Sequence, residues 1–115
     1  MSVANPLIQA TLLGEAVENG PVAVFVADEN RRYVAVNQRA CTLLGYAREE
    51  LLAKYVHEIA TDTGRWDDMR DEGTIAGTAI LTHKDGSTLE FSYVAGSTVV
   101  AGMPVYVSVG APVER

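Results

Sequence analysis

The apolar residues between positions 6 and 18 recur with the period of an α-helix. The stripe consists of Leu7, Ile8, Ala10, Leu12, Leu13, Ala16 and Val17. Asn5 followed by Pro6 is typical of an N-cap with proline at the first helical position. Asn19 and Gly20 are typical of a helix end. The pattern predicts an amphipathic cap helix over residues 1–19, followed by one domain over residues 20–115.

From residue 22 onward the pattern is that of β-strands separated by turns. Strands are predicted over residues 22–27, 33–36, 74–82, 87–99 and 105–109. The first is a continuous apolar run rich in β-branched side chains, which indicates a strand covered on both faces. Asp85-Gly86 is a strong hairpin signal, and Ala101-Gly102 marks a second turn.

Short helices are predicted between the second and third strands. Asn37 can cap a helix that runs to Leu44 and ends at Gly45. A second helix is predicted over residues 48–54, and a third includes Trp66 and Met69. The order predicts an α+β fold, with a five-stranded antiparallel sheet, short helices on one face and the N-terminal cap helix.

Taken together, these fragments resemble a PAS domain. The resemblance is carried by PVAVFVAD at residues 21–28, YVAVN at 33–37, LGY at 44–46, REELL at 48–52 and KDGS at 84–87. It extends from about residue 18 to about residue 111 and implies the PAS fold. It also implies a bacterial intracellular sensor that controls an attached or separate output, such as a histidine kinase or a transcription regulator. Ala47 departs from the pattern, because the family usually has Ser or Thr there as a helix cap.

The residues that carry chemistry in some PAS relatives are absent from the matching positions. Light-sensing members have a reactive cysteine where this chain has Val56, and haem-binding members have a histidine in the segment 65–70, which has none here. Cys41 lies among apolar residues and is interpreted as a core thiol. The resemblance therefore argues against haem and flavin, and we expect no covalently bound cofactor.

The sequence offers no catalytic or metal-binding pattern. His57 and His83 are far apart, and no phosphate loop, nucleophile elbow or paired His-Cys motif is present. An acidic cluster at residues 62–72 is interpreted as a solvated surface, although a carboxylate pair stays open there. We expect a protein that is not an enzyme and holds no metal.

Strand parity predicts an apolar cavity between the sheet and the short helices. Ala23, Phe25 and Ala27 are placed on one face with Leu89, Phe91, Tyr93, Val107 and Val109. The predicted ligand-binding residues are Phe25, Ala27, Ala40, Leu44, Leu52, Val56, Trp66, Met69, Phe91, Tyr93 and Val107. These positions match the family's ligand cavity, which suits a non-covalent hydrophobic molecule such as a fatty acid or an aromatic. The alternative is that larger neighbours fill the space.

Charge and composition limit the classes of partner and the cellular compartment that we expect. The net charge is −6 and the nine Lys and Arg are scattered, which argues against nucleic-acid binding. A single cysteine, no signal peptide and no long apolar run favour the cytoplasm without membrane insertion.

The cap helix is the predicted contact with a second copy. Its stripe is too wide for one sheet face to cover, so Ile8, Leu12, Leu13 and Ala16 are predicted at a homodimer interface. Two functions stay open: a sensor that binds a small hydrophobic ligand and signals through the dimer, or a ligand-free module for protein interaction and dimerisation.

Overall fold

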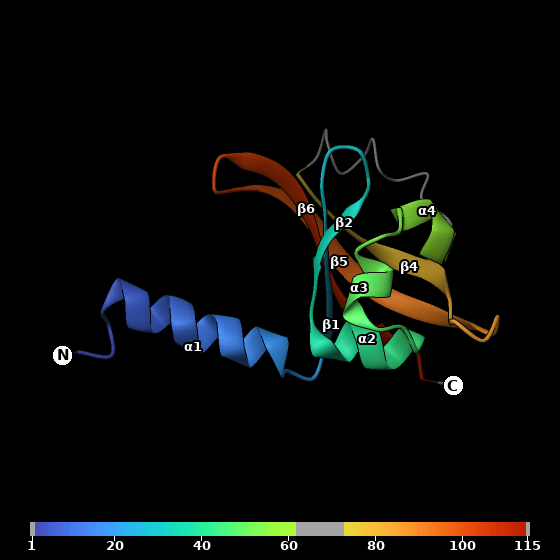
Figure 1. The fold of residues 1–115 in the computed structure, drawn as a ribbon, viewed down its shortest axis with the longest axis horizontal. Helices are drawn as coiled ribbons and strands as arrows, with labels where there is room; N and C mark the ends of the chain where they lie inside the picture. The colour runs from blue at the N-terminus through green and yellow to red at the C-terminus, as the bar shows by residue number, and fades with distance from the viewer. Residues whose placement is uncertain (1, 62–72, 115) are drawn as a thin grey trace.

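The computed structural model describes residues 2–61 and 73–114 (Figure 1). The elements are α1 (Pro6–Glu18), β1 (Ala23–Ala27), β2 (Tyr33–Val36), α2 (Gln38–Leu44), α3 (Arg48–Leu51), α4 (Val56–Ile59), β3 (Ala60–Thr61), β4 (Thr74–Thr82), β5 (Thr88–Val100) and β6 (Met103–Pro112). The predicted α+β class is confirmed, and the sheet is antiparallel throughout.

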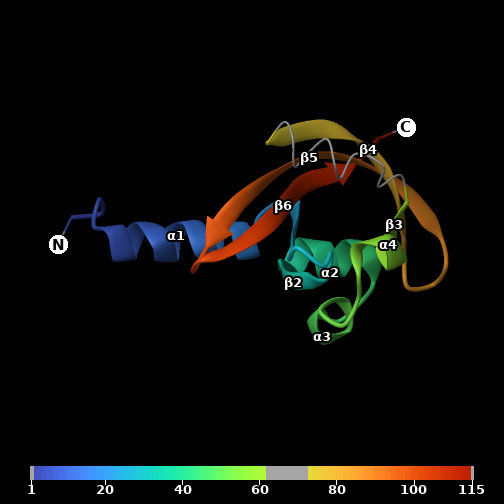
Figure 2. The same cartoon turned by 90° about the horizontal axis from the view of Figure 1, so that it is seen from above.

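The described strands form one curled sheet in the order β2-β1-β6-β5-β4-β3. Helices α2, α3 and α4 lie on its concave side (Figure 2). We call this side the inner face and the other the outer face. The prediction of five strands was one short, because β3 pairs only Ala60 with Leu81 and Thr61 with Ile80. Two residues are too few to show an alternating pattern.

The helix boundaries follow the capping residues. Asn5 Oδ1 accepts a hydrogen bond from the Leu7 amide at 2.9 Å, and α1 starts at the next residue. Asn37 caps α2 through the Ala40 amide, and Gly45 ends it with φ 75°, a conformation that favours glycine. The end signals predicted for both helices are therefore the ones observed, but α1 spans Pro6–Glu18 and is shorter than the cap helix predicted over residues 1–19.

The remaining helices are shorter than predicted or were missed. The helix predicted over residues 48–54 ends at Leu51, and α4 was not predicted at all. Ala47 is the N-cap residue of α3, and its methyl side chain cannot cap the helix. Glu50 Oε1 instead accepts from the Ala47 amide at 2.9 Å. The predicted helix with Trp66 and Met69 lies outside the described residues.

The main core lies between the inner face and the short helices. Its buried residues are Ala23, Phe25, Ala27, Tyr33, Val36, Ala40, Cys41, Leu44, Leu51, Ile59, Ala79, Leu81 and Phe91. The ring of Phe25 meets Phe91 edge-on, with centroids 5.9 Å apart, and lies 5.6 Å from the ring of Tyr33. Aromatic pairs in this arrangement stabilise the core beyond the area that they bury.

The predicted orientation of β6 was wrong by one residue. Val107 pairs with Val26 and Val109 pairs with Val24, so both valines lie on the outer face. Gly110 pairs with Tyr93 on the inner face instead. A Cβ at Gly110 would lie 2.8 Å from Phe91 Cζ and would overlap the Ser92 carbonyl oxygen. The Phe91 ring occupies that space, so a glycine rather than a valine fits the inner face of β6 here.

Helix α1 projects from the domain body (Figures 1 and 2). None of its residues is buried within the described structure. Leu7 is 80% exposed and Leu13 63% exposed, so the apolar stripe does not lie on the sheet of its own chain. Packing within the chain alone therefore does not account for the stripe.

Candidate functional site

The structure brings together most of the predicted cavity residues. Phe25, Ala27 and Phe91 are buried on the inner face, and Ala40 and Leu44 of α2 are fully buried opposite them. The half-buried residues packed against this core include Leu52, Val56 and Tyr93. Val107 does not belong to the group, because it lies on the outer face. Trp66 and Met69 lie outside the described residues.

Small side chains lie on both sides of this core. Ala23, Ala27 and Ala79 lie on the inner face and Ala40 lies on α2, and all four are buried. Alanine contributes little volume to this part of the core. The surroundings are apolar, which suits contact with an apolar group.

Tyr33 is a polar member of this core that the sequence reasoning did not select. It pairs with Ala27 across an irregularity in the β1–β2 register and is 5% exposed. Burial raises the pKa of the Tyr33 hydroxyl, so the group stays protonated and can donate a hydrogen bond. Strict alternation along β2 would place Tyr33 on the outer face with Ala35. The bulge instead turns Tyr33 to the inner face, opposite Ala27.

Cys41 is a buried thiol on α2, as predicted. Burial raises the pKa of the Cys41 thiol, and the neighbouring Arg48 guanidinium lowers it by a smaller amount. The thiol is therefore held in its protonated, weakly nucleophilic form. The arrangement favours packing over covalent chemistry.

The two histidines lie away from this core. The His57 ring stacks on Tyr55 at 5.7 Å on the surface. His83 lies against Gly45, where any Cβ would overlap its ring, and His83 Nδ1 accepts from the Asp85 amide at 3.1 Å. No group of three metal-binding side chains occurs within residues 2–61 and 73–114.

The β4–β5 turn is fastened to the short helices. The Lys84 amide donates to Leu44 O at 2.9 Å, and Lys84 Nζ lies 2.9 Å from Glu50 Oε2. The hydrogen bond from the Ala47 amide lowers the pKa of the Glu50 carboxyl most, and the hydrogen bond from Lys84 lowers it further. These contacts hold α2 and α3 against the far end of the sheet.

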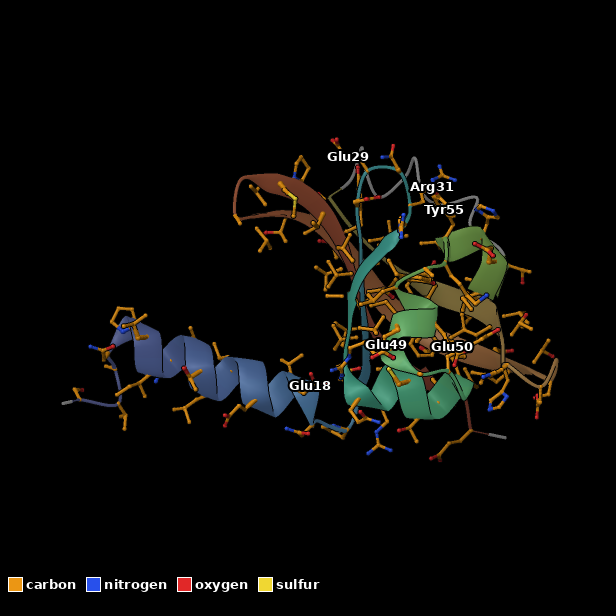
Figure 3. All side chains as sticks on the ribbon, viewed as in Figure 1. Glu18, Glu29, Arg31, Glu49, Glu50 and Tyr55 are labelled. Atoms are coloured by element: carbon orange, nitrogen blue, oxygen red, sulfur yellow. The ribbon has the colours of Figure 1, made fainter. Side chains whose placement is uncertain are left out.

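A second set of polar contacts lies where α1 meets the domain body. Asn37 Nδ2 donates to Val17 O at 2.7 Å and to Val22 O at 2.9 Å. Arg48 Nη2 donates to Glu18 Oε1 at 2.5 Å, and Figure 3 shows Glu18 at the end of α1 nearest the sheet. We call Glu18, Asn37 and Arg48 the α1 clasp. Sequence reasoning found only the capping role of Asn37.

A shallow groove runs beside the α1 clasp on the outer face. Its lining consists of Gly14, Val17, Glu18, Val24, Val26, Ala35, Val36 and Asn37. Its volume of about 180 Å³ is below the roughly 300–1,000 Å³ of typical small-molecule sites. The groove is therefore a poor match for a ligand of that size.

The residues predicted at a dimer interface all lie on α1. Leu12 is 51% exposed and Leu13 and Ala16 are exposed, whereas Ile8 is half-buried. None of the four is buried within the described part of the chain. No helix within the described part of the chain is long and apolar enough to cross a membrane.

Solved structures with the same fold include several PAS domains. The PAS domain of a two-component sensor histidine kinase matches with a TM-score of 0.84 at 16% identity, covering 93% of this chain and 98% of that chain. The PAS domain of an HTR-like protein from Haloarcula marismortui matches with a TM-score of 0.79 at 21% identity, covering 91% and 92%. The PAS domain of nitrogen regulation protein NR(II) from Vibrio parahaemolyticus matches at 0.78 and 12% identity, covering 89% and 98%.

A comparison with curated protein sequences finds no match. A comparison with family models does find one. The model described as PAS domain matches residues 11–79, which is more than half of the chain and extends from the sixth residue of α1 into β4. The structural neighbours show the PAS fold, in agreement with the predicted fold. This chain belongs to the PAS domain family.

Proposed function

We propose that the domain is a sensory module of a bacterial, cytoplasmic signalling system that binds a small hydrophobic molecule in its core. The observation that carries the proposal is the inner face, where buried alanines surround the Phe25–Phe91 pair. A fatty acid or an aromatic compound suits such a lining, and Tyr33 offers it one hydroxyl donor. The ligand is non-covalent, since Cys41 is protonated and buried.

The proposed output is a separate or attached signalling protein. The PAS domain of a two-component sensor histidine kinase and that of a nitrogen regulation protein are among the structural neighbours, which supports a role in signalling. The domain itself is proposed to be no enzyme, because its described core offers apolar side chains and no paired acid and base. Signal transmission would run through a homodimer formed by α1, whose leucines are exposed.

Native mass spectrometry followed by solvent extraction tests the ligand directly. We expect the native protein to carry added mass, and the extract to contain an apolar compound of that mass. Ala27→Leu should displace this compound with little loss of thermal stability, because the new side chain occupies ligand space. Ala53→Leu, at an exposed position after α3, is the matched control and should keep the compound.

A close-packed core gives the opposite pattern in the same experiment. The native protein would then carry no extractable molecule, and Ala27→Leu would cost about 1–3 kcal/mol through overpacking. That result would leave the second candidate, a ligand-free interaction module. The exposed Leu7, Leu12 and Leu13 favour this second function independently of any cavity.

A further inference from the structure

The α1 clasp joins α1 to the starts of α2 and α3. Arg48 is the first residue of α3, and its partner Glu18 is the last residue of α1. Leu51, the last residue of α3, is fully buried in the core. One turn of helix therefore contacts the core at one end and α1 at the other.

Apart from this pair, the hydrogen bond from Asn37 Nδ2 to Val17 O at 2.7 Å is the main polar contact described between α1 and the domain body. Within the described structure the helix has no buried residue, so it gains little from packing. Both side chains of the Glu18–Arg48 pair are 40% exposed, and such pairs are weak. The Arg48 guanidinium also lies beside the Cys41 thiol of α2, so it has a contact on the core side of the pair as well.

The connection after α1 is suited to one tight geometry. A Cβ at Gly20 would lie 2.5 Å from the Ala16 carbonyl oxygen. The chain can make this close return only because position 20 is glycine. Gly20 thus permits the direction of α1, while the clasp selects it.

We propose that the Glu18–Arg48 pair is a conformational latch that ties the direction of α1 to the position of α3. Helix α1 then moves with α3 while the latch is closed and samples other directions when it opens. The latch goes beyond the proposed ligand binding, because any displacement of α3, whatever its cause, reaches α1 through Arg48. Such coupling acts equally in both directions.

Electron-spin distance measurements on the full chain test the latch. Spin labels are attached at Gln9→Cys on α1 and Ser92→Cys on β5, both exposed positions. Cys41 is buried, and attempted labelling of the parent chain checks that it stays unlabelled. Measurements at low protein concentration in the presence of unlabelled protein exclude distances between molecules. We expect one narrow distance distribution with the latch closed.

Variants of the latch should change this distribution. Arg48→Met and Glu18→Gln should each make it at least about twofold broader, because a weakly held helix samples several directions once its ion pair is lost. The exchange Glu18→Arg with Arg48→Glu should restore the narrow distribution. Arg39→Met, at an exposed position on α2, is the matched control and should leave it unchanged.

The outcomes decide the proposal without relying on one variant. Glu18 lies outside the core, so Glu18→Gln remains informative even if Arg48→Met fails to fold by circular dichroism. In about 1 M salt, where screening acts within about 3 Å, the parent distribution should also broaden. An unchanged distribution in folded Glu18→Gln would overturn the proposal, whether or not the core holds a ligand.

Discussion

Asn37 shows how much one side chain can organise at the residue scale. It is 4% exposed, and its amide group makes four hydrogen bonds, to Val17 O, Val22 O, Val24 N and Ala40 N. The side chain of an asparagine offers two donors and one oxygen acceptor, and all are used here. The sequence indicated its capping bond to α2, but the bonds to α1 and β1 depend on tertiary contacts that no local pattern records.

Phe91 provides a stability prediction at the same scale. Its side chain is 2% exposed and packs on Phe25 and Gly110. Phe91→Ala should lower the free energy of unfolding by about 3–5 kcal/mol, because Gly110 beside the ring has no side chain that could fill the cavity. Urea unfolding followed by circular dichroism measures the change.

A neighbouring position on β5 serves as the control for Phe91. Ser92→Ala is exposed on the outer face and should change the free energy of unfolding by no more than about 0.5 kcal/mol. Equal stability of Phe91→Ala and the parent chain would contradict the inner-face register.

The absence of a coloured cofactor is a second residue-scale prediction. The thiol position of light-sensing relatives is Val56 here, and Cys41 is buried. The purified domain should therefore show no visible absorption band of haem or flavin, which an absorption spectrum of concentrated protein checks. A band that persists after dialysis would contradict the proposed apolar ligand.

At the element scale, α3 illustrates a helix start that uses a carboxylate instead of a capping hydroxyl. The resemblance identified Ala47 as a departure, and the structure shows its compensation. Glu50 accepts from the Ala47 amide and also pairs with Lys84 of the β4–β5 turn. One carboxylate thus supports both the helix start and the nearby turn.

This carboxylate makes α3 sensitive to acid. The pKa of Glu50 in the fold lies below its ordinary value of 4.5, chiefly because of the Ala47 amide. A lowered pKa stabilises the fold above the unfolded-state pKa, and this contribution is lost as the pH falls through the folded-state pKa. Thermal midpoints measured downward from pH 7 should therefore fall less steeply for Glu50→Gln than for the parent.

Glu49→Gln is the matched control for the acid titration, one residue away on the same helix. It removes the same charge and leaves the Ala47 and Lys84 contacts of Glu50 in place, so it should flatten the curve less than Glu50→Gln does. If Glu49→Gln and Glu50→Gln flatten the curve equally, the effect arises from net charge and the capping role of Glu50 is wrong.

The elements differ in how well their sequence predicts them. The ends of α1 and α2 could be predicted because both helices carry an asparagine cap and a terminal glycine or asparagine, although the cap helix predicted over residues 1–19 is longer than α1. Helix α4 and strand β3 were missed because four and two residues show less than a usable period. The face of β6 was misassigned because hydrophobicity favours valine inside, whereas the observed register places Gly110 on the inner face, where the Phe91 ring leaves no room for a Cβ.

For the candidate site, the sequence predicted the inner face better than its surroundings. Phe25, Ala27 and Phe91 follow from strand alternation. Tyr33 required the β1–β2 bulge, and the ion pair of Glu18 with Arg48 joins residues thirty positions apart. Such contacts arise only after the elements are assembled.

At the scale of the whole molecule, α1 projects from the domain body and carries exposed apolar side chains along its length. We expect a homodimer, because exposed apolar patches usually mark contacts and twofold symmetry is the commonest arrangement. Light scattering across micromolar concentrations should give twice the monomer mass. Leu12→Asp should yield a folded monomer, since the interface would otherwise bury an unpaired charge.

Gln9→Asp introduces the same charge off the apolar stripe and should remain dimeric. A parent chain that stays monomeric at high micromolar concentration would contradict the dimer. A dimer that survives both Leu12→Asp and deletion of residues 1–19 would place the contact on the exposed valines of the outer face instead.

The pairing of β1 with β6 has a consequence for how the domain is made. Phe25 lies opposite Ser108, so the first strand of the sheet pairs with the last to be synthesised. At about 5–20 residues per second, β1 waits roughly 4–16 seconds for this neighbour during translation. Throughout that interval the apolar strand has only β2 beside it and cannot occupy its interior place in the sheet. The nascent chain is therefore expected to depend on protection from aggregation until β6 has emerged from the ribosome.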